Sequence, residues 1–140
     1  MDQEVHEFLL EHLSGIMNND IPSYHETTAE DLTLYEWWVT PHRLDGLPFH
    51  EFMMTSNASR GTVFGAQEKG ESRFDLSNLL IQRYGDTAIA SYTLLISTLV
   101  PDGVKTAAHN ESRVMVKLSG KWKIVHVHKS PAYAAPHVQP

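Results

Sequence analysis

The sequence contains no cysteine, no long apolar run and no cluster of basic residues, and each absence excludes a class of protein. Without cysteine there is neither a disulfide framework nor a thiolate metal site. No apolar stretch approaches the roughly 20 residues that a membrane-spanning helix needs. Eleven Lys and Arg against seventeen Asp and Glu give a net charge of −6. Because nucleic-acid binding requires neutralisation of phosphates, we expect neither a nucleic acid nor a membrane as partner.

The first residues, MDQEVHEFLLEH, are acidic and lack the basic start and long apolar core of a secretory signal. We therefore expect a cytoplasmic protein. A chain of 140 residues suits a single domain with one hydrophobic core. We expect this domain over residues 1–131, followed by a Pro- and Ala-rich flexible tail over residues 132–140.

Apolar residues at helical spacing predict a first amphipathic helix over residues 2–17, whose apolar stripe must be covered by another layer. Asp20 can cap a short second helix that runs through Thr28, with Pro22 tolerated in its first turn. Pro48 is expected to open a third short helix. The chain therefore begins with helices.

The rest of the chain alternates strand patterns with turn signals. Loops or turns are expected over residues 40–47, 56–61 and 68–71. Strands are expected over residues 32–38, 62–67, 74–83 and 87–100, and in a final hairpin over 111–130. Helices before long antiparallel strands imply an α+β fold, with the helices on one face of a curved sheet. Between the two layers a cone can form whose open end admits a small molecule.

The final hairpin carries polar side chains in alternation around a Ser119-Gly120 turn. Because side chains two apart share a face, Arg113 projects with His109, Glu111 and Lys117, while the opposite face is apolar: Val114, Val116 and Leu118. On the return strand the same rule places two histidines beside a tryptophan: Trp122, Ile124, His126 and His128. Three short helices cannot cover both faces, so one is expected to meet another subunit.

Five motifs in this order, LTLYEWW, LDGLPFHEF, YGDTAIASY, ESRV and GKWKIVHVHKSPA, resemble the association (hub) domain of calcium/calmodulin-dependent protein kinase II. The match runs over most of the chain. It implies the cone of the nuclear transport factor 2-like fold, shared with ketosteroid isomerase and SnoaL-like cyclases. It also implies assembly into a homodimer or larger ring, and a pocket for small carboxylates with Arg113 and His50 at the matching positions.

The sequence departs from the family in three ways. The second pocket arginine has no counterpart, since Thr93 and Leu94 stand at the aligned positions. The segment over residues 56–74 is several residues longer. Neither a kinase domain, a glycine-rich phosphate loop nor a calmodulin-binding helix is present, so the resemblance does not bring kinase activity with it.

The expected ligand is a small anion. A guanidinium inside a cone needs a partner or an anionic ligand, and its planar fork suits a carboxylate. The alternative is a structural Arg113 that pairs with Glu111 or His109. Likewise, His50 and Tyr92 are either pocket or core residues. The expected ligand-binding set is Arg113, His50, Tyr35, Trp37, Tyr92, Glu111 and His126.

His126 and His128 have a spacing that suits a metal but lack a third ligand, so we expect no metal and no cofactor. We assign these two histidines to structural hydrogen bonds or to a subunit contact.

Two functions remain open. The first is a non-enzymatic, self-associating domain with an anion-accepting pocket. The second is a small isomerase, cyclase or hydratase acting in the same cone, which would need a carboxylate base. Glu111 is the best carboxylate by strand parity, but a pair with Arg113 would keep it ionised with a lowered pKa. We therefore favour the first function.

Overall fold

The computed structural model describes residues 1–60 and 72–132. The strand expected over residues 62–67, the loop over 68–71 and nearly all of the C-terminal tail lie outside this part of the chain. In chain order the elements are α1 (Gln3–Met17), α2 (Ile21–Thr27), β1 (Thr28–Glu36), β2 (Leu44–Asp45), α3 (Leu47–Arg60), β3 (Ser72–Tyr84), β4 (Thr87–Val100), β5 (Gly103–Leu118) and β6 (Lys121–Pro131). None of the described helices is long and apolar enough to cross a membrane.

The first two helices confirm their sequence signals. The side chain of Asp2 caps α1 by accepting a hydrogen bond from the Val5 amide at 3.0 Å. Asp20 caps α2 in the same way, accepting from the Ser23 amide at 3.2 Å. The third helix differs from the prediction. It runs on to Arg60, because neither Pro nor Gly follows Pro48 within it, so residues 56–60 are helical where a turn is expected over residues 56–61.

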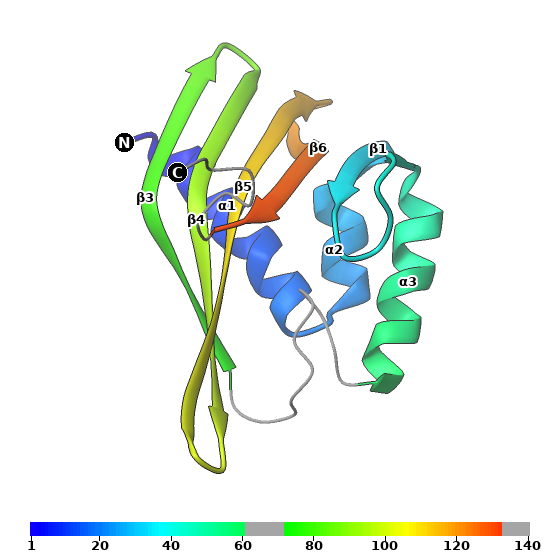
Figure 1. Ribbon diagram of the computed structural model, residues 1–140. Helices are drawn as coiled ribbons and strands as arrows, with labels where there is room; N and C mark the ends of the chain where they lie inside the picture. The colour runs from blue at the N-terminus through cyan, green and yellow to red at the C-terminus, as the bar shows by residue number, and fades with distance from the viewer. Residues whose placement is uncertain (61–71, 133–140) are drawn as a thin grey trace, which may run out of the picture.

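The strands form a single six-stranded mixed sheet in the order β2-β1-β6-β5-β4-β3. Its one parallel pair among the described strands joins β1 to β6; the other pairs are antiparallel. The loop expected over residues 40–47 contains β2, which pairs with β1. All three helices lie against one face of the curled sheet (Figure 1). The α+β fold predicted from the element order is confirmed.

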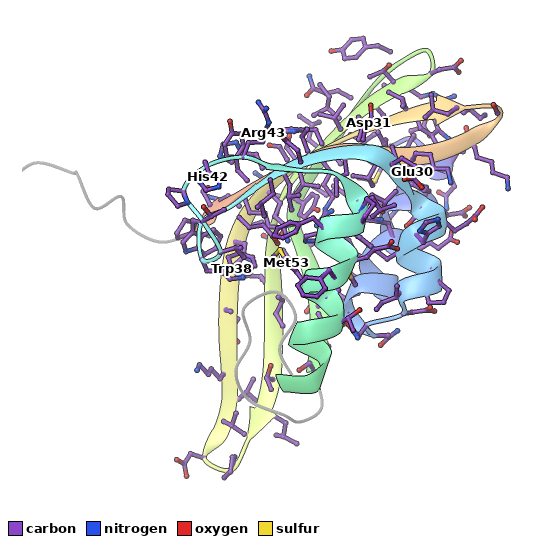
Figure 2. All side chains as sticks on the ribbon, turned by 90° about the vertical axis from the view of Figure 1, so that its right-hand side faces the viewer. Glu30, Asp31, Trp38, His42, Arg43 and Met53 are labelled. Atoms are coloured by element: carbon purple, nitrogen blue, oxygen red, sulfur yellow. The ribbon has the colours of Figure 1, made fainter. Side chains whose placement is uncertain are left out.

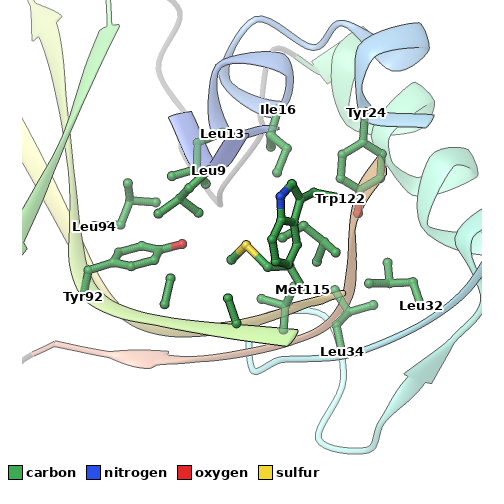
Figure 3. Packing of buried hydrophobic residues seen from close by; sticks show 14 of the residues in the cluster. Leu9, Leu13, Ile16, Tyr24, Leu32, Leu34, Tyr92, Leu94, Met115 and Trp122 are labelled. Carbon is green, nitrogen blue, oxygen red and sulfur yellow. The ribbon is translucent and has the colours of Figure 1, made fainter. Parts of the chain in front are cut away.

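The inner face of the sheet, toward the helices, carries the hydrophobic core. Figure 3 shows Leu9, Leu13 and Ile16 of α1 facing the sheet, where they pack in one cluster with buried residues of β4, β5 and β6: Tyr92, Leu94, Met115 and Trp122. On β5 this inner face also carries the polar set that includes Arg113. The apolar set Val114, Val116 and Leu118 lies on the opposite, outer face, as strand alternation predicts.

A β-bulge in β6 changes which residues of the hairpin share a face. Val114 pairs with His126 but the next residue, Met115, pairs with Ile124, so Val125 is an extra residue in the ladder. After one extra residue every following side chain changes face. Val127 and Lys129 are therefore buried, whereas His126 and His128 point outward. The expectation that both histidines share a face with Trp122 was wrong for this reason.

Candidate functional site

Arg113 lies at the centre of a buried polar network. Its side chain is 1% exposed and makes three contacts on the inner face of the sheet. The Nε atom donates to the Tyr92 hydroxyl at 2.8 Å, and Nη2 donates to Oε1 of Glu111 at 3.3 Å. On the other side of the guanidinium, Nη1 lies 2.9 Å from Nε2 of His12, which comes from α1.

Tyr92 and Glu111 are cross-strand partners, and they complete this network. The Tyr92 hydroxyl donates to Oε1 of Glu111 at 2.8 Å. Burial by itself would raise the pKa of Glu111, but the adjacent charges of Arg113 and Lys129 lower this pKa to about 2. Burial raises the pKa of Tyr92. Tyr92 is therefore a neutral donor, and Glu111 is an ionised acceptor at neutral pH.

A second buried network runs from β6 through β1 to the helices. Lys129 Nζ donates to Oε2 of Glu36 at 2.8 Å, and the other Glu36 oxygen lies 3.1 Å from Nε2 of His50. His50 Nδ1 lies 2.6 Å from the Tyr24 hydroxyl. Burial would raise the pKa of Glu36, but Lys129 and His50 lower it well below its usual range. The rings of Tyr24 and His12, 5.3 Å apart, connect this network with that of Arg113.

The charges of the two networks balance. Each buried cation, Arg113 and Lys129, contacts a buried carboxylate. Two polar atoms nevertheless lack a hydrogen-bond partner: Oε2 of Glu111 and Nδ1 of His109, which lie 3.8 Å apart. The rings of Trp37 and Trp38 pack against His109, at 5.1 and 5.3 Å between centroids.

These tryptophans mark one edge of the polar interior. Trp37 is 40% exposed, so it belongs to the rim. Figure 2 shows Trp38 on the same connection between β1 and β2 as His42 and Arg43. The Lys129 ammonium lies 5.2 Å from the ring centre of Trp38. The aromatic rim and the buried ion pairs are therefore in direct contact.

The structure brings together some of the residues expected from the sequence and separates others. Arg113, Tyr92 and Glu111 form one network, and His50 lies in the second. Tyr35 and His126 lie on the outer face of the sheet, with ring centroids 6.2 Å apart. They do not reach the buried networks. In residues 1–60 and 72–132 there is no group of three His, Asp or Glu residues arranged to hold a metal ion.

Four residues of the networks are outside the expected ligand-binding set: His12, Tyr24, Glu36 and Lys129. His12 lies within the apolar stripe of α1, where helical periodicity treats it as core. Strict alternation along β6 puts Lys129 on the face opposite Trp122, because the bulge at Val125 has no signal in the sequence. Glu36 and Lys129 are partners in the parallel pairing of β1 with β6, which no short-range signal indicates.

A groove of about 520 Å³ lies on the outer face of the sheet. Its lining combines hydroxyl, amide and imidazole groups, from Asn78, Ser91, Thr93, Asn110, Ser112, His128 and Ser130, with the apolar residues Leu79 and Leu80. It lies beside a second bulge, between Ser77 and Leu80 of β3, where Asn78 has a positive φ of 56°. The bulge in β6 thus decides which side chains lie on the inner face, and the bulge in β3 lies beside the groove on the outer face.

Comparisons with known proteins agree with this geometry. A nuclear transport factor 2-like protein from Pseudomonas putida has the same fold, with a TM-score of 0.76, 14% identity, and coverage of 98% of this chain and 94% of that one. The S. rosetta calcium/calmodulin-dependent protein kinase II hub superposes with a TM-score of 0.72 and 28% identity, covering 91% of this chain and 94% of the hub.

The sequence relatives are longer proteins. Calcium/calmodulin-dependent protein kinase type II of Caenorhabditis briggsae is 28% identical over 120 residues, which are 84% of this chain and 21% of the kinase. The chain thus spans about a fifth of this relative. The sequence model of the family described as the calcium/calmodulin dependent protein kinase II association domain matches residues 1–133. The chain therefore belongs to the calcium/calmodulin-dependent protein kinase II association-domain family.

Proposed function

We propose that this protein is a self-associating domain whose subunits meet through the outer face of the sheet. The observation that carries the proposal is that all three described helices lie against the opposite face (Figure 1). A sheet face of this size that no described helix covers is a candidate contact surface for another subunit. The family to which the chain belongs is named for association, and its S. rosetta relative is described as a hub.

The composition of the outer face also supports the proposal. Apolar side chains oppose one another across β4 and β5, including the pair Ile89 and Val114. Farther along the same two strands, Leu99 and Val104 are partners with 57% and 66% of their surface exposed. Between these apolar regions lies the polar groove. An apolar contact with hydrogen-bonding groups at its centre suits a specific subunit interface. In this proposal Tyr35 and His126 belong to the interface region.

We place the second part of the function, a site for a small anionic ligand, inside the cone. The proposed site comprises Arg113, His50, Tyr92 and Glu111, with Trp37 at its rim. Its support is the buried guanidinium of Arg113, because its planar set of N–H donors suits a carboxylate. The ionised state of Glu111 disfavours the alternative of a proton-transferring enzyme, since a base with a pKa of about 2 is weak at neutral pH.

Cysteine cross-linking tests the proposed contact surface, and the natural chain has no cysteine to interfere. Ser91, Ser112 and Ser130 on the outer face are replaced one at a time by Cys, and Glu7→Cys on α1 is the control. Mild oxidation should link subunits covalently for at least one outer-face variant and not for Glu7→Cys. Cross-linking of the α1 variant alone would place the contact on the helical side and refute the proposal.

A further inference from the structure

We infer that His12 determines which ligands the Arg113 site accepts: its imidazole accepts the Nη1 hydrogen bond that a ligand carboxylate would otherwise accept. This inference rests on the proposed ligand site and deepens it. The sequence resemblance points to Arg113 and His50 as the pocket residues. His12 enters only through the structure, where α1 brings it to the guanidinium.

The hydrogen bonds fix the protonation state of His12. A guanidinium has donors only, so Nε2 of His12 must accept from Nη1 at 2.9 Å. The proton of the neutral ring is then on Nδ1, which donates to the Thr27 hydroxyl at 2.8 Å. That hydroxyl in turn donates to the Ser23 carbonyl at 3.0 Å. The hydrogen bonds from Arg113 through His12 and Thr27 to the Ser23 carbonyl therefore all run in one consistent direction.

Burial and the adjacent guanidinium support the same state. The side chain of His12 is fully buried, and this burial, followed by the positive charge of Arg113, lowers its pKa well below the usual value. A neutral imidazole can serve as a permanent acceptor for Arg113. A protonated one would lose this role and would place a second cation beside the guanidinium.

The partners of Arg113 also limit how a carboxylate can approach. A bidentate carboxylate needs two parallel N–H groups along one edge of the guanidinium. Tyr92 and Glu111, which bond to each other, take the edge formed by Nε and Nη2. His12 takes the Nη1 side. Tyr92 and His12 are both neutral, but of the three partners only His12 comes from a different layer of the fold, so it is the partner whose removal opens an edge.

Two consequences follow. The wild-type site should bind simple carboxylates weakly, because a ligand must displace an imidazole or accept a single remaining N–H. A small side chain at position 12 should instead leave a space beside Arg113, with the Thr27 hydroxyl at its far end. Formate, acetate or free imidazole could fill that space and restore the lost hydrogen bond.

The test compares wild type with His12→Ala and His12→Gln. Alanine opens the space without disturbing α1, since it favours helices. The glutamine amide can still accept from Arg113 and donate to Thr27. Each protein is titrated with sodium formate, sodium acetate and imidazole, against sodium chloride at equal ionic strength, with the Tm as readout. The Kd for acetate should be about tenfold lower for His12→Ala, as expected for one hydrogen bond to a charged group. Imidazole should raise the Tm of this variant only.

The possible results separate the two claims. If wild type responds to acetate and His12→Ala responds no better, the inference fails while the ligand site stands. If only His12→Ala responds, the anion site proposed for the natural chain fails, while the claim that the His12 imidazole takes the place of a ligand at Nη1 stands. An equal gain in His12→Gln would also refute the inference. Should His12→Ala not fold, nitrogen NMR of the wild type decides: His12 must be neutral with its proton on Nδ1, and any other state refutes the inference.

Discussion

Arg113 and Glu111, two residues apart on the same face of β5, form an ion pair with 3.3 Å between Nη2 and Oε1, and both side chains are buried. This relationship supports the structural alternative for Arg113 that the sequence left open. A buried cation with a buried counterion is costly to separate, because removing one partner leaves the other without compensation. A ligand that binds Arg113 must therefore use N–H groups of the guanidinium beside those that already bond to Glu111.

The first prediction concerns this pair. Arg113→Leu should lower the free energy of unfolding by roughly 3 kcal/mol or more, because the Glu111 carboxylate stays buried without its cation. Adding Glu111→Leu to the same chain should recover much of the loss. Urea denaturation of the two single variants and the double variant measures the coupling. Equal stability of wild type and Arg113→Leu would show that the arginine is not part of the scaffold.

A second prediction concerns acid. The pKa of Glu111 is lowered from 4.5 to about 2 in the folded protein. Its contribution to stability is therefore fully present above pH 4.5 and is lost as the pH falls toward 2, because the unfolded chain binds the proton first. Denaturation at a series of pH values should show this loss. In Glu111→Gln the free energy of unfolding should change less steeply with pH over the same range. If the free energy of unfolding of Glu111→Gln depends on pH as steeply as that of wild type, the acid sensitivity comes from other groups.

A third prediction tests the second ion pair. Lys129→Met removes the ammonium from Glu36, whose carboxylate is equally buried. The variant should lose roughly 3 kcal/mol of stability. Lys123→Met, on the same strand, is the matched control, since Lys123 is only partly buried and contacts a backbone carbonyl. A similar loss in both variants would mean that the Glu36 pair has no special role.

A fourth prediction tests the outer face. Val114→Glu places a charge in an apolar region of the proposed interface, next to Ile89 on β4. Burial of that charge in a subunit contact is unfavourable, so the variant should shift toward smaller species in light scattering. Leu10→Glu is the control, because Leu10 is exposed on α1. Both variants should retain a folded circular dichroism spectrum, and equal dissociation of the two would contradict the proposed surface.

The sequence was sufficient for features that depend on local patterns. The helical spacing of Val5, Leu9 and Leu13 predicted α1, and Asp20 predicted the start of α2, because both signals act within one or two turns. The alternation on β5 correctly grouped Arg113 with Glu111. The motifs that resemble the hub domain predicted the fold and the family, and both are confirmed.

Features that depend on long-range pairing could not be predicted. The extra residue at Val125 exists only relative to β5, so its effect on Lys129 is invisible in β6 alone. His12 looks like an ordinary core position until α1 is packed against Arg113. For Tyr35 and His126 the residue types suggested a pocket, but the strand faces that carry them point the other way.

The central claim is that the chain self-associates, and sedimentation velocity of the wild-type protein tests it most directly. The chain mass is 15.8 kDa. At micromolar concentration and ordinary salt, the account predicts a species of at least twice this mass, and a ring larger than a dimer would agree specifically with the hub family. A single species with the mass of one chain under these conditions would contradict the account.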